Sequence, residues 1–289
     1  MQLVVTRILA WYEGRRRDLP WRAPGTDAWG IYLSEVMAQQ TQVDRVAVAW
    51  QAWMERWPTP AALAAASPAQ VLRQWDRLGY PRRALWLHAA ARRIVDEHGG
   101  EVPRDEAALR ALPGCGEYTA AAVRAFAFGE RTPVLDVNVR RVHARLFDGV
   151  AAPRSAITRA EREHHERFLP GDAQVAATLS QAVMEFGALQ CTAREPDCPT
   201  CPLADRCAWL AAGRPAAPGG RPRQGRFEGS DRQCRGALMR LLREAAGGVT
   251  ASALEAVWAD ALQRQRCLDG LVADGLVVPL PRRRYTLPT

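Results

Sequence analysis

The chain has 289 residues, of which 48% are hydrophobic and 24% are charged, and its formal net charge is +8 at pH 7. This balance excludes a disordered chain, collagen and a coiled coil, and the length indicates roughly two domains. All 39 basic residues are arginine, so mechanisms that need a lysine amine are excluded. A basic, arginine-rich chain suits a polyanion, and nucleic acid is the leading class of partner.

No stretch approaches the roughly 18 uninterrupted apolar residues that a membrane span requires, because Arg, Asp or Pro interrupts every Ala- and Leu-rich run. The first residues also lack the basic, apolar and small-residue order of a secretory signal. We therefore expect a cytoplasmic protein that starts at Met1 and makes no membrane contact.

The first domain is predicted to be all-α. Over residues 1–210 apolar side chains recur at mostly helical intervals, with no sustained alternation of the kind that strands show. Ser67–Pro68 is a typical helix start, and Gly99–Gly100 is a typical helix end. Residues 211–231 are rich in Pro, Gly and Arg, which indicates a linker.

Residues 232–289 predict a second, smaller domain. Arg232–Arg243 is amphipathic, Thr250 can cap a second helix, and Ala259–Ala273 makes a third. Two short strands follow, with Arg282–Arg284 in their turn, and three helices followed by two strands form a winged-helix-like arrangement. The segment is either a DNA contact or a packing module that never touches DNA.

Four of the seven cysteines form one compact run. They occupy the loop 191–207, as Cys191, Cys198, Cys201 and Cys207. Thiolates this dense in a cytoplasmic chain hold a metal rather than form disulfides. Zinc and iron–sulfur both remain open from the spacing, but four-cysteine zinc sites usually use two separated CxxC pairs, so we favour a [4Fe–4S] cluster. Cys115, Cys234 and Cys267 fit no ligand pattern.

Leu112–Gly116 is a glycine-rich turn between two predicted helices. Gly114 and Gly116 allow close backbone approach, and the N–H groups that start the next helix form an anion site, so the turn is predicted to bind phosphate. Alone, this is a weak signal, because any interhelical turn can contain it. Asp136 follows at a predicted helix start, where an N-cap is its simplest interpretation.

Together these pieces resemble the adenine DNA glycosylase (MutY) family, within the helix-hairpin-helix glycosylases that carry an iron–sulfur loop. The resemblance covers residues 10–210. It rests on motifs that occur in family order, namely Leu19–Arg22, Leu33–Val43, Leu78–Tyr80, Leu112–Gly116, Leu135–Val142 and the cysteine loop. It implies a helix-hairpin-helix glycosylase fold and removal of adenine opposite 8-oxoguanine or guanine in double-stranded DNA.

The chemistry of such a reaction needs two acidic groups. Cleavage of an N-glycosidic bond builds positive charge on the sugar, and adenine leaves poorly until it is protonated. The resemblance makes Glu35 the proton donor and Asp136 the anion, and adds Tyr118 and Asn138 to the catalytic set. The apolar helix around Glu35 favours its protonated form by desolvation. Related lyases carry lysine where this chain has Tyr118, so we expect a monofunctional glycosylase.

The adenine must also leave the base stack before it can react. The resemblance implies that Gln40 and Tyr80 insert into the duplex. It also implies that the hairpin glycines, Gly114 and Gly116, contact the DNA. It assigns the base pocket to Trp21, Arg22 and Glu185. Without the resemblance, Tyr80 and Trp21 would be interpreted as core aromatics and Gln40 as part of a solvated helix face. Arg22 and Glu185 would be interpreted as surface charges.

The chain departs from the family in three places. Val137 stands where the family usually has Gly, and Pro81 stands where it usually has a second Tyr. The tail beyond Cys207 is too short and too helical for the MutT-like domain that examines 8-oxoguanine, so opposite-base selectivity is open.

Two alternatives remain. A mismatch thymine or uracil DNA glycosylase would share the hairpin, the aspartate and the cluster, although the Gln39–Gln42 run and Glu185 favour adenine. A non-catalytic iron–sulfur DNA-binding regulator would need neither Glu35 nor Asp136. In the favoured interpretation the protein is a monomer that works at the nucleoid.

Overall fold

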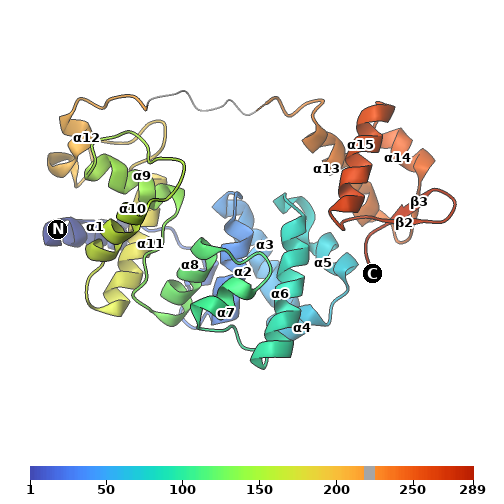
Figure 1. Cartoon of the computed structure of the whole chain (residues 1–289), viewed down its shortest axis with the longest axis horizontal. Coiled ribbons are helices and arrows are strands. Elements are labelled where there is room, and N and C mark those ends of the chain that lie inside the picture. Colours follow the sequence, from blue (N-terminus) through green and yellow to red (C-terminus); the bar gives the residue numbers. More distant parts are fainter. Residues whose placement is uncertain (218–224) are drawn as a thin grey trace. The chain divides into compact units, whose positions relative to one another are not determined.

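The computed structural model describes residues 1–217 and 225–289. Residues 218–224, inside the linker expected at 211–231, lie outside the described residues. The described chain is mainly helical, which confirms the predicted all-α class (Figure 1). Within these ranges no helix is both long and apolar enough to cross a membrane.

The chain divides into two compact units. The first comprises Met1–Tyr32, Arg104–Arg110 and Cys115–Arg221, and the second comprises Leu33–Pro103, Ala111–Gly114 and Pro222–Thr289. Residues 1–210 therefore contribute to both units, and the C-terminal segment belongs to the second. Helices α2 (Ala28–Ala38) and α7 (Glu106–Ala111) contribute residues to both.

The remaining elements of the first unit are α1 (Gln2–Arg15), η1 (Pro20–Arg22), α8 (Glu117–Phe128), α9 (Val137–Leu146), α10 (Arg159–Phe168), α11 (Ala173–Leu189), η3 (Ala204–Arg206) and α12 (Ala208–Ala211). Helix α11 packs against α1, α8 and α9 (Figure 1). Its apolar residues recur at helical spacing, so Leu179, Val183 and Phe186 are buried in the core. The helix begins at Asp172, whose carboxylate accepts a hydrogen bond from the N–H of Val175 (2.9 Å).

The N-terminal part of the second unit consists of α3 (Val43–Arg56), α4 (Pro60–Ala64), α5 (Pro68–Trp75), η2 (Asp76–Leu78) and α6 (Arg82–His98). Helix α6 packs against α4 and α5. Both predicted signals are confirmed: Ser67 forms a capping box with Gln70 at the start of α5, and Gly99 ends α6 in the left-handed conformation. Trp53 and Trp75 are fully buried and meet edge to face, with ring centroids 5.5 Å apart.

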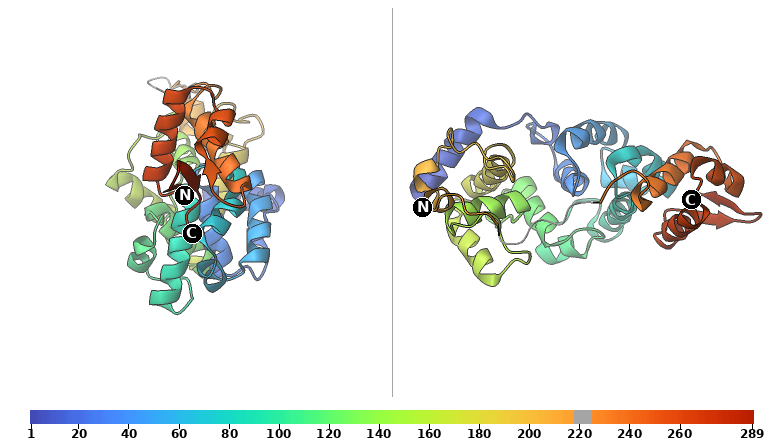
Figure 2. Two further views of the ribbon diagram at one scale, coloured as in Figure 1. Left: turned by 90° about the vertical axis from the view of Figure 1, so that its right-hand side faces the viewer. Right: turned by 90° about the horizontal axis from the view of Figure 1, so that it is seen from above.

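Residues 231–289 form the C-terminal module of the second unit. Its elements are α13 (Asp231–Glu244), β1 (Val249–Thr250), α14 (Ala251–Val257), α15 (Ala261–Ala273), β2 (Val278–Leu280) and β3 (Arg284–Thr286). The three helices and the β2–β3 hairpin confirm the winged-helix-like arrangement (Figure 2). The sheet has the order β1-β3-β2, and its first strand was not predicted because two residues show no alternation.

Candidate active site

Asp136 occupies the N-cap of α9, at the predicted helix start. Its Oδ1 accepts a hydrogen bond from the backbone N–H of Val139 (2.6 Å), and its Oδ2 accepts one from the side-chain amide of Asn138 (2.8 Å). Burial raises the pKa of Asp136 above its ordinary value, and the hydrogen bonds offset only part of this rise. The carboxylate is therefore partly desolvated and is held in one orientation by its own helix.

A line of hydrogen bonds continues from Asp136 to the cysteine loop. The guanidinium group of Arg141 donates to Asn138 Oδ1 (2.8 Å), to the carbonyl of Gly187 (2.6 Å) and to the carbonyl of Cys191 (2.9 Å). The Asn138 amide is thus bonded on both sides, since it donates to Asp136 and accepts from Arg141. This bonding fixes its orientation toward the carboxylate.

Glu185, on α11, is buried, with 1% of its surface exposed. The backbone N–H and the guanidinium group of Arg17 donate three hydrogen bonds to it (2.9, 2.8 and 2.9 Å), and Arg22 donates a fourth (3.1 Å). Burial alone would raise the pKa of Glu185, but the hydrogen bonds from Arg17 and Arg22 outweigh it and lower the pKa to about 2. The structure thus brings Glu185 together with Arg22, while Trp21 beside Arg22 is almost fully buried.

The four cysteines of the loop line one small cavity of about 30 Å³ in the first unit. All four are free thiols, and burial raises the pKa of Cys201 to about 11. In the described parts of the chain, no three His, Cys, Asp or Glu side chains are grouped to hold one metal ion. Four thiols that line one cavity have the donor chemistry that an iron–sulfur cluster requires.

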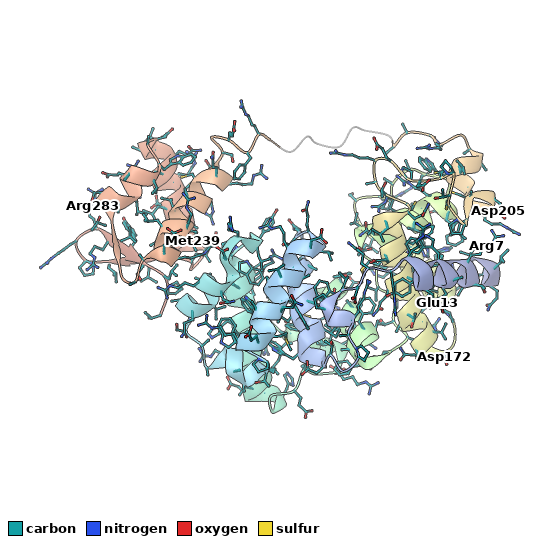
Figure 3. The ribbon with its side chains drawn as sticks, turned by 180° about the vertical axis from the view of Figure 1, so that it is seen from behind. Arg7, Glu13, Asp172, Asp205, Met239 and Arg283 are labelled. Carbon is teal, nitrogen blue, oxygen red and sulfur yellow. The ribbon has the colours of Figure 1, made fainter. Side chains whose placement is uncertain are left out.

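The cysteine loop also contacts helices α1 and α9. Arg145 on α9 donates to the sulfur of Cys191 (3.4 Å), and the thiol of Cys207 donates to the carbonyl of Arg145 (3.5 Å). Arg7 on α1 forms an ion pair with Asp205 (2.5 Å), and Figure 3 shows the two residues next to each other. These contacts bring the candidate ligands to the core of the first unit.

Glu35 belongs to the second unit, on the C-terminal half of α2. It is 9% exposed, and its neighbours Ser34, Val36 and Met37 are almost completely buried. The carboxyl group is therefore buried, as desolvation of the predicted proton donor requires.

The predicted helix-hairpin-helix turn connects α7 to α8. Gly114 has a φ of +76°, which favours glycine, and a Cβ there would make a tight contact of 3.0 Å with the Cβ of Trp86. Gly116 is different, because it is the N-cap of α8 with an ordinary φ and open space around its Cα. Its missing side chain leaves the start of α8 uncovered beside the half-buried Tyr118.

Gln40 and Tyr80 are both exposed in left-handed turns of the second unit, with φ values of 57° and 47°. Such conformations are costly for residues other than glycine and concentrate at functional positions. Tyr80 is 55% exposed, so its interpretation as a core aromatic is wrong.

Arg83 connects these two turns. Its guanidinium group donates to carbonyls at the end of α2, including that of Gln39 (2.5 Å), and to the hydroxyl of Thr41 (2.8 Å). It also donates to the carbonyl of Gly79 (3.1 Å), next to Tyr80. Arg83 is 4% exposed, and burial lowers its pKa to about 10.

Comparison with known proteins identifies the family. Residues 33–165 match the model of the HhH-GPD superfamily base excision DNA repair proteins. An adenine DNA glycosylase of Mycolicibacterium smegmatis is 49% identical over 288 residues, which cover 99% of this chain and 97% of that protein. The chain belongs to the adenine DNA glycosylase family. It is therefore a DNA glycosylase, an enzyme that hydrolyses N-glycosyl bonds.

Other relatives and solved structures are similar to this chain over about 70% of its length. The human adenine DNA glycosylase is 39% identical over 213 residues, which cover 69% of this chain and 38% of the human protein. A thermostable thymine-DNA glycosylase is 28% identical, with a TM-score of 0.65 over 73% of this chain and 96% of that chain. Endonuclease III, in a non-covalent complex with DNA, is 22% identical with a TM-score of 0.63 over 73% of this chain and 95% of that chain, which shows the fold alone.

Three arginines of this adenine DNA glycosylase family member were missed by the sequence interpretation. They are Arg17, Arg83 and Arg141. Apart from Asn138, their partners lie 42 or more residues away or are backbone carbonyls, which no local spacing reveals. The only sequence signal is that Arg141 stands one turn after Asn138, on the same face of a helix.

Proposed function

We propose that the protein removes adenine from double-stranded DNA where it is mispaired with 8-oxoguanine or guanine. Glu35 protonates the adenine, and Asp136 stabilises the positive charge that develops on the sugar. Membership of the adenine DNA glycosylase family supports adenine as the base that is removed. The identity of the opposite base is inferred from the sequence motifs.

The geometry around Asp136 carries this proposal. A carboxylate that stabilises a cationic transition state needs a fixed orientation in a water-poor setting, because preorganised charge acts most strongly there. Asn138 and the N–H of Val139 hold Asp136 in this way. An N-cap alone would need only the bond from Val139.

The reaction is proposed to be monofunctional. A lyase that forms a Schiff base needs an amine nucleophile, and the 289-residue chain contains no lysine. Tyr118 occupies the position of the lyase lysine. Borohydride should therefore trap little enzyme on DNA, and strong trapping that persists after the N-terminal amine is blocked would contradict the proposal.

The cysteine loop is proposed to hold a [4Fe–4S] cluster. Cys191, Cys198, Cys201 and Cys207 would each ligate one iron, since all four line one cavity. Once bound, the cluster would join the loop covalently to the end of α11. Purified protein should then contain iron and acid-labile sulfide in equal amounts, and Cys198→Ala should lose both while Cys234→Ala keeps them. Zinc without sulfide would overturn the assignment.

Single-turnover excision with enzyme in excess tests the substrate and the mechanism. The duplexes carry A opposite 8-oxoguanine, G or T, and T or U opposite G. We expect excision of A opposite 8-oxoguanine and G, with a loss of about 10²–10⁴-fold in Glu35→Gln. Asp136→Asn should lose a comparable factor, although Asn caps helices as well as Asp does.

Asp172→Asn is the matched control, because Asp172 caps α11 through the same type of bond. Its excision rate should equal that of the wild type. Equal excision of A opposite T would contradict the proposed mispair. Excision of T or U opposite G, with A untouched, would favour the second candidate function, a mismatch thymine or uracil DNA glycosylase. The chain is 35% identical to a thymine/uracil-DNA glycosylase of Pyrobaculum aerophilum, which supports this candidate.

A further inference from the structure

The tip of the β2–β3 hairpin presents two unneutralised arginines. Arg282 and Arg283 are exposed and have φ values of 60° and 54°, and Figure 3 shows Arg283 pointing away from the module. Among the residues described, neither forms an ion pair or a side-chain hydrogen bond. Most other arginines of the module are engaged: Arg235 pairs with Asp274 and Arg266 with Asp231.

The base of this hairpin is held in place. The guanidinium group of Arg284 donates to the carbonyl of Gly248 (3.1 Å), and its backbone pairs with Leu280 on one side and Thr250 on the other. The two strands of the hairpin therefore belong to the three-stranded sheet. Because the sheet holds the hairpin in place, the two charges at its tip are presented by a folded element.

On helix α15, the third helix of the module, the side chains that could read bases are already bonded within the protein. Its exposed face carries Leu262, Gln265, Arg266 and Asp269. Arg266 is neutralised by an ion pair, Gln265 is bonded to Asp269 (2.8 Å), and Leu262 is 83% exposed. Base recognition in a major groove uses Arg, Asn or Gln groups that are free to bond to the bases. The negative charge of Asp269 would repel phosphate. The charge of the module is thus concentrated in the hairpin rather than in this helix.

We propose that the C-terminal module is a second DNA-contacting surface, at which Arg282 and Arg283 bind backbone phosphates of duplex DNA without reading its sequence. Two guanidinium groups at an exposed turn suit phosphate oxygens, which accept bidentate hydrogen bonds from arginine. The duplex is favoured as the partner because the protein belongs to a family of DNA glycosylases. The contact does not depend on which base is removed.

The salt dependence of DNA binding tests this surface. Full-length wild type and the double variant Arg282→Asn/Arg283→Asn are titrated with an undamaged duplex, followed by fluorescence anisotropy at 50–200 mM salt. Asparagine tolerates the left-handed turn, so the hairpin keeps its fold. Loss of two phosphate contacts should reduce the slope of log K against log salt by about 1.8. Over this fourfold rise in salt, the wild type should lose about 12-fold more affinity than the variant.

A charge-matched control is available on α13. Arg232→Gln/Arg240→Gln also removes two exposed charges from the module, and its slope should stay at the wild-type value. An unchanged slope in the hairpin variant, or an equal decrease in both variants, would overturn the proposal. So would a loss confined to one of two unrelated duplex sequences. Binding to undamaged DNA is measured without excision, so failure of the proposed adenine chemistry leaves the result interpretable.

Discussion

Gly187 shows how one missing side chain can position a candidate catalytic group. A Cβ at this residue would lie 2.8 Å from the Cβ of Asn138 and 2.9 Å from its carbonyl oxygen. Contacts this short do not occur between real Cβ atoms, so α11 and the start of α9 would have to separate. Arg141 also bonds both Asn138 and the carbonyl of Gly187, so separation of the two helices should disturb the orientation of Asn138.

Gly187→Ala should therefore slow base excision by at least about 10-fold, even though alanine normally stabilises a helix by about 1 kcal/mol relative to glycine. Gly236→Ala on α13 is the control, because a Cβ there meets nothing within 4 Å. It should raise the melting temperature slightly and leave the rate unchanged. Equal rates in the two variants would show that Asn138 does not need this packing.

Two stacked histidines make the first unit sensitive to acid. The rings of His143 and His165 lie 3.7 Å apart, and both residues are buried. Burial, followed by the neighbouring His164, lowers the pKa of His165 to about 4, although Glu161 opposes this shift. Burial and the other two histidines lower the pKa of His143 as well.

The unfolded chain takes up protons near the ordinary histidine pKa of about 6.5, whereas folded His165 stays neutral until about pH 4. The free energy of unfolding should therefore fall as the pH drops through this window, by about 2 kcal/mol for His165 between pH 7 and pH 5. Urea unfolding at the two pH values measures the fall. His165→Phe should make it smaller, and an identical fall in the variant would contradict the assignment.

At the scale of elements, the two exposed turns of the second unit depend on one buried side chain. The two terminal nitrogens of Arg83 lie within hydrogen-bonding distance of six acceptors, at the end of α2, on Thr41 and in the residues just before Tyr80. Left-handed turns at Gln40 and Tyr80 are unfavourable by themselves, so these bonds help to maintain them.

Arg83→Lys should disturb both turns, because an ammonium group donates only three hydrogen bonds and lacks the planar fork of arginine. We expect single-turnover excision to fall by at least about 10-fold, with a loss of stability of about 2 kcal/mol. Arg82→Lys is the neighbouring control, since Arg82 is half-exposed and pairs with Asp274 (3.2 Å). If Arg83→Lys behaved like this control, Arg83 would not be holding the turns.

At the scale of the whole molecule, the two units should respond differently to loss of the proposed cluster. The cysteine loop contacts α1 and α9 through Arg7 and Arg145, so it belongs to the packing of the first unit. Helices α3–α6 of the second unit have their own core around Trp53 and Trp75.

Removal of iron by a chelator should therefore increase hydrogen exchange in residues 137–146 and 191–207. Residues 43–98 should keep their protection, which serves as the internal control. Mass spectrometry of peptic peptides gives both values in one experiment. Uniform deprotection of the two units, or none in the loop, would contradict this division.

The sequence determined the helices, the hairpin turn, the cysteine run and the family motifs. These features depend on spacing within a few residues: Ser67 caps α5, Gly114 needs a positive φ, and Thr250 caps α14 through the N–H of Ala253. Local backbone chemistry controls such positions, so neighbouring residues are enough to predict them.

The tertiary structure decided which of these residues act together. It placed Arg141 between Asn138 and Cys191. It buried Glu185 in contact with Arg17 and Arg22, and it left Tyr80 exposed. It also left Arg282 and Arg283 unpaired while the arginines around them found partners. Such pairings depend on which distant segments pack within hydrogen-bonding distance, and separation along the chain does not encode that distance.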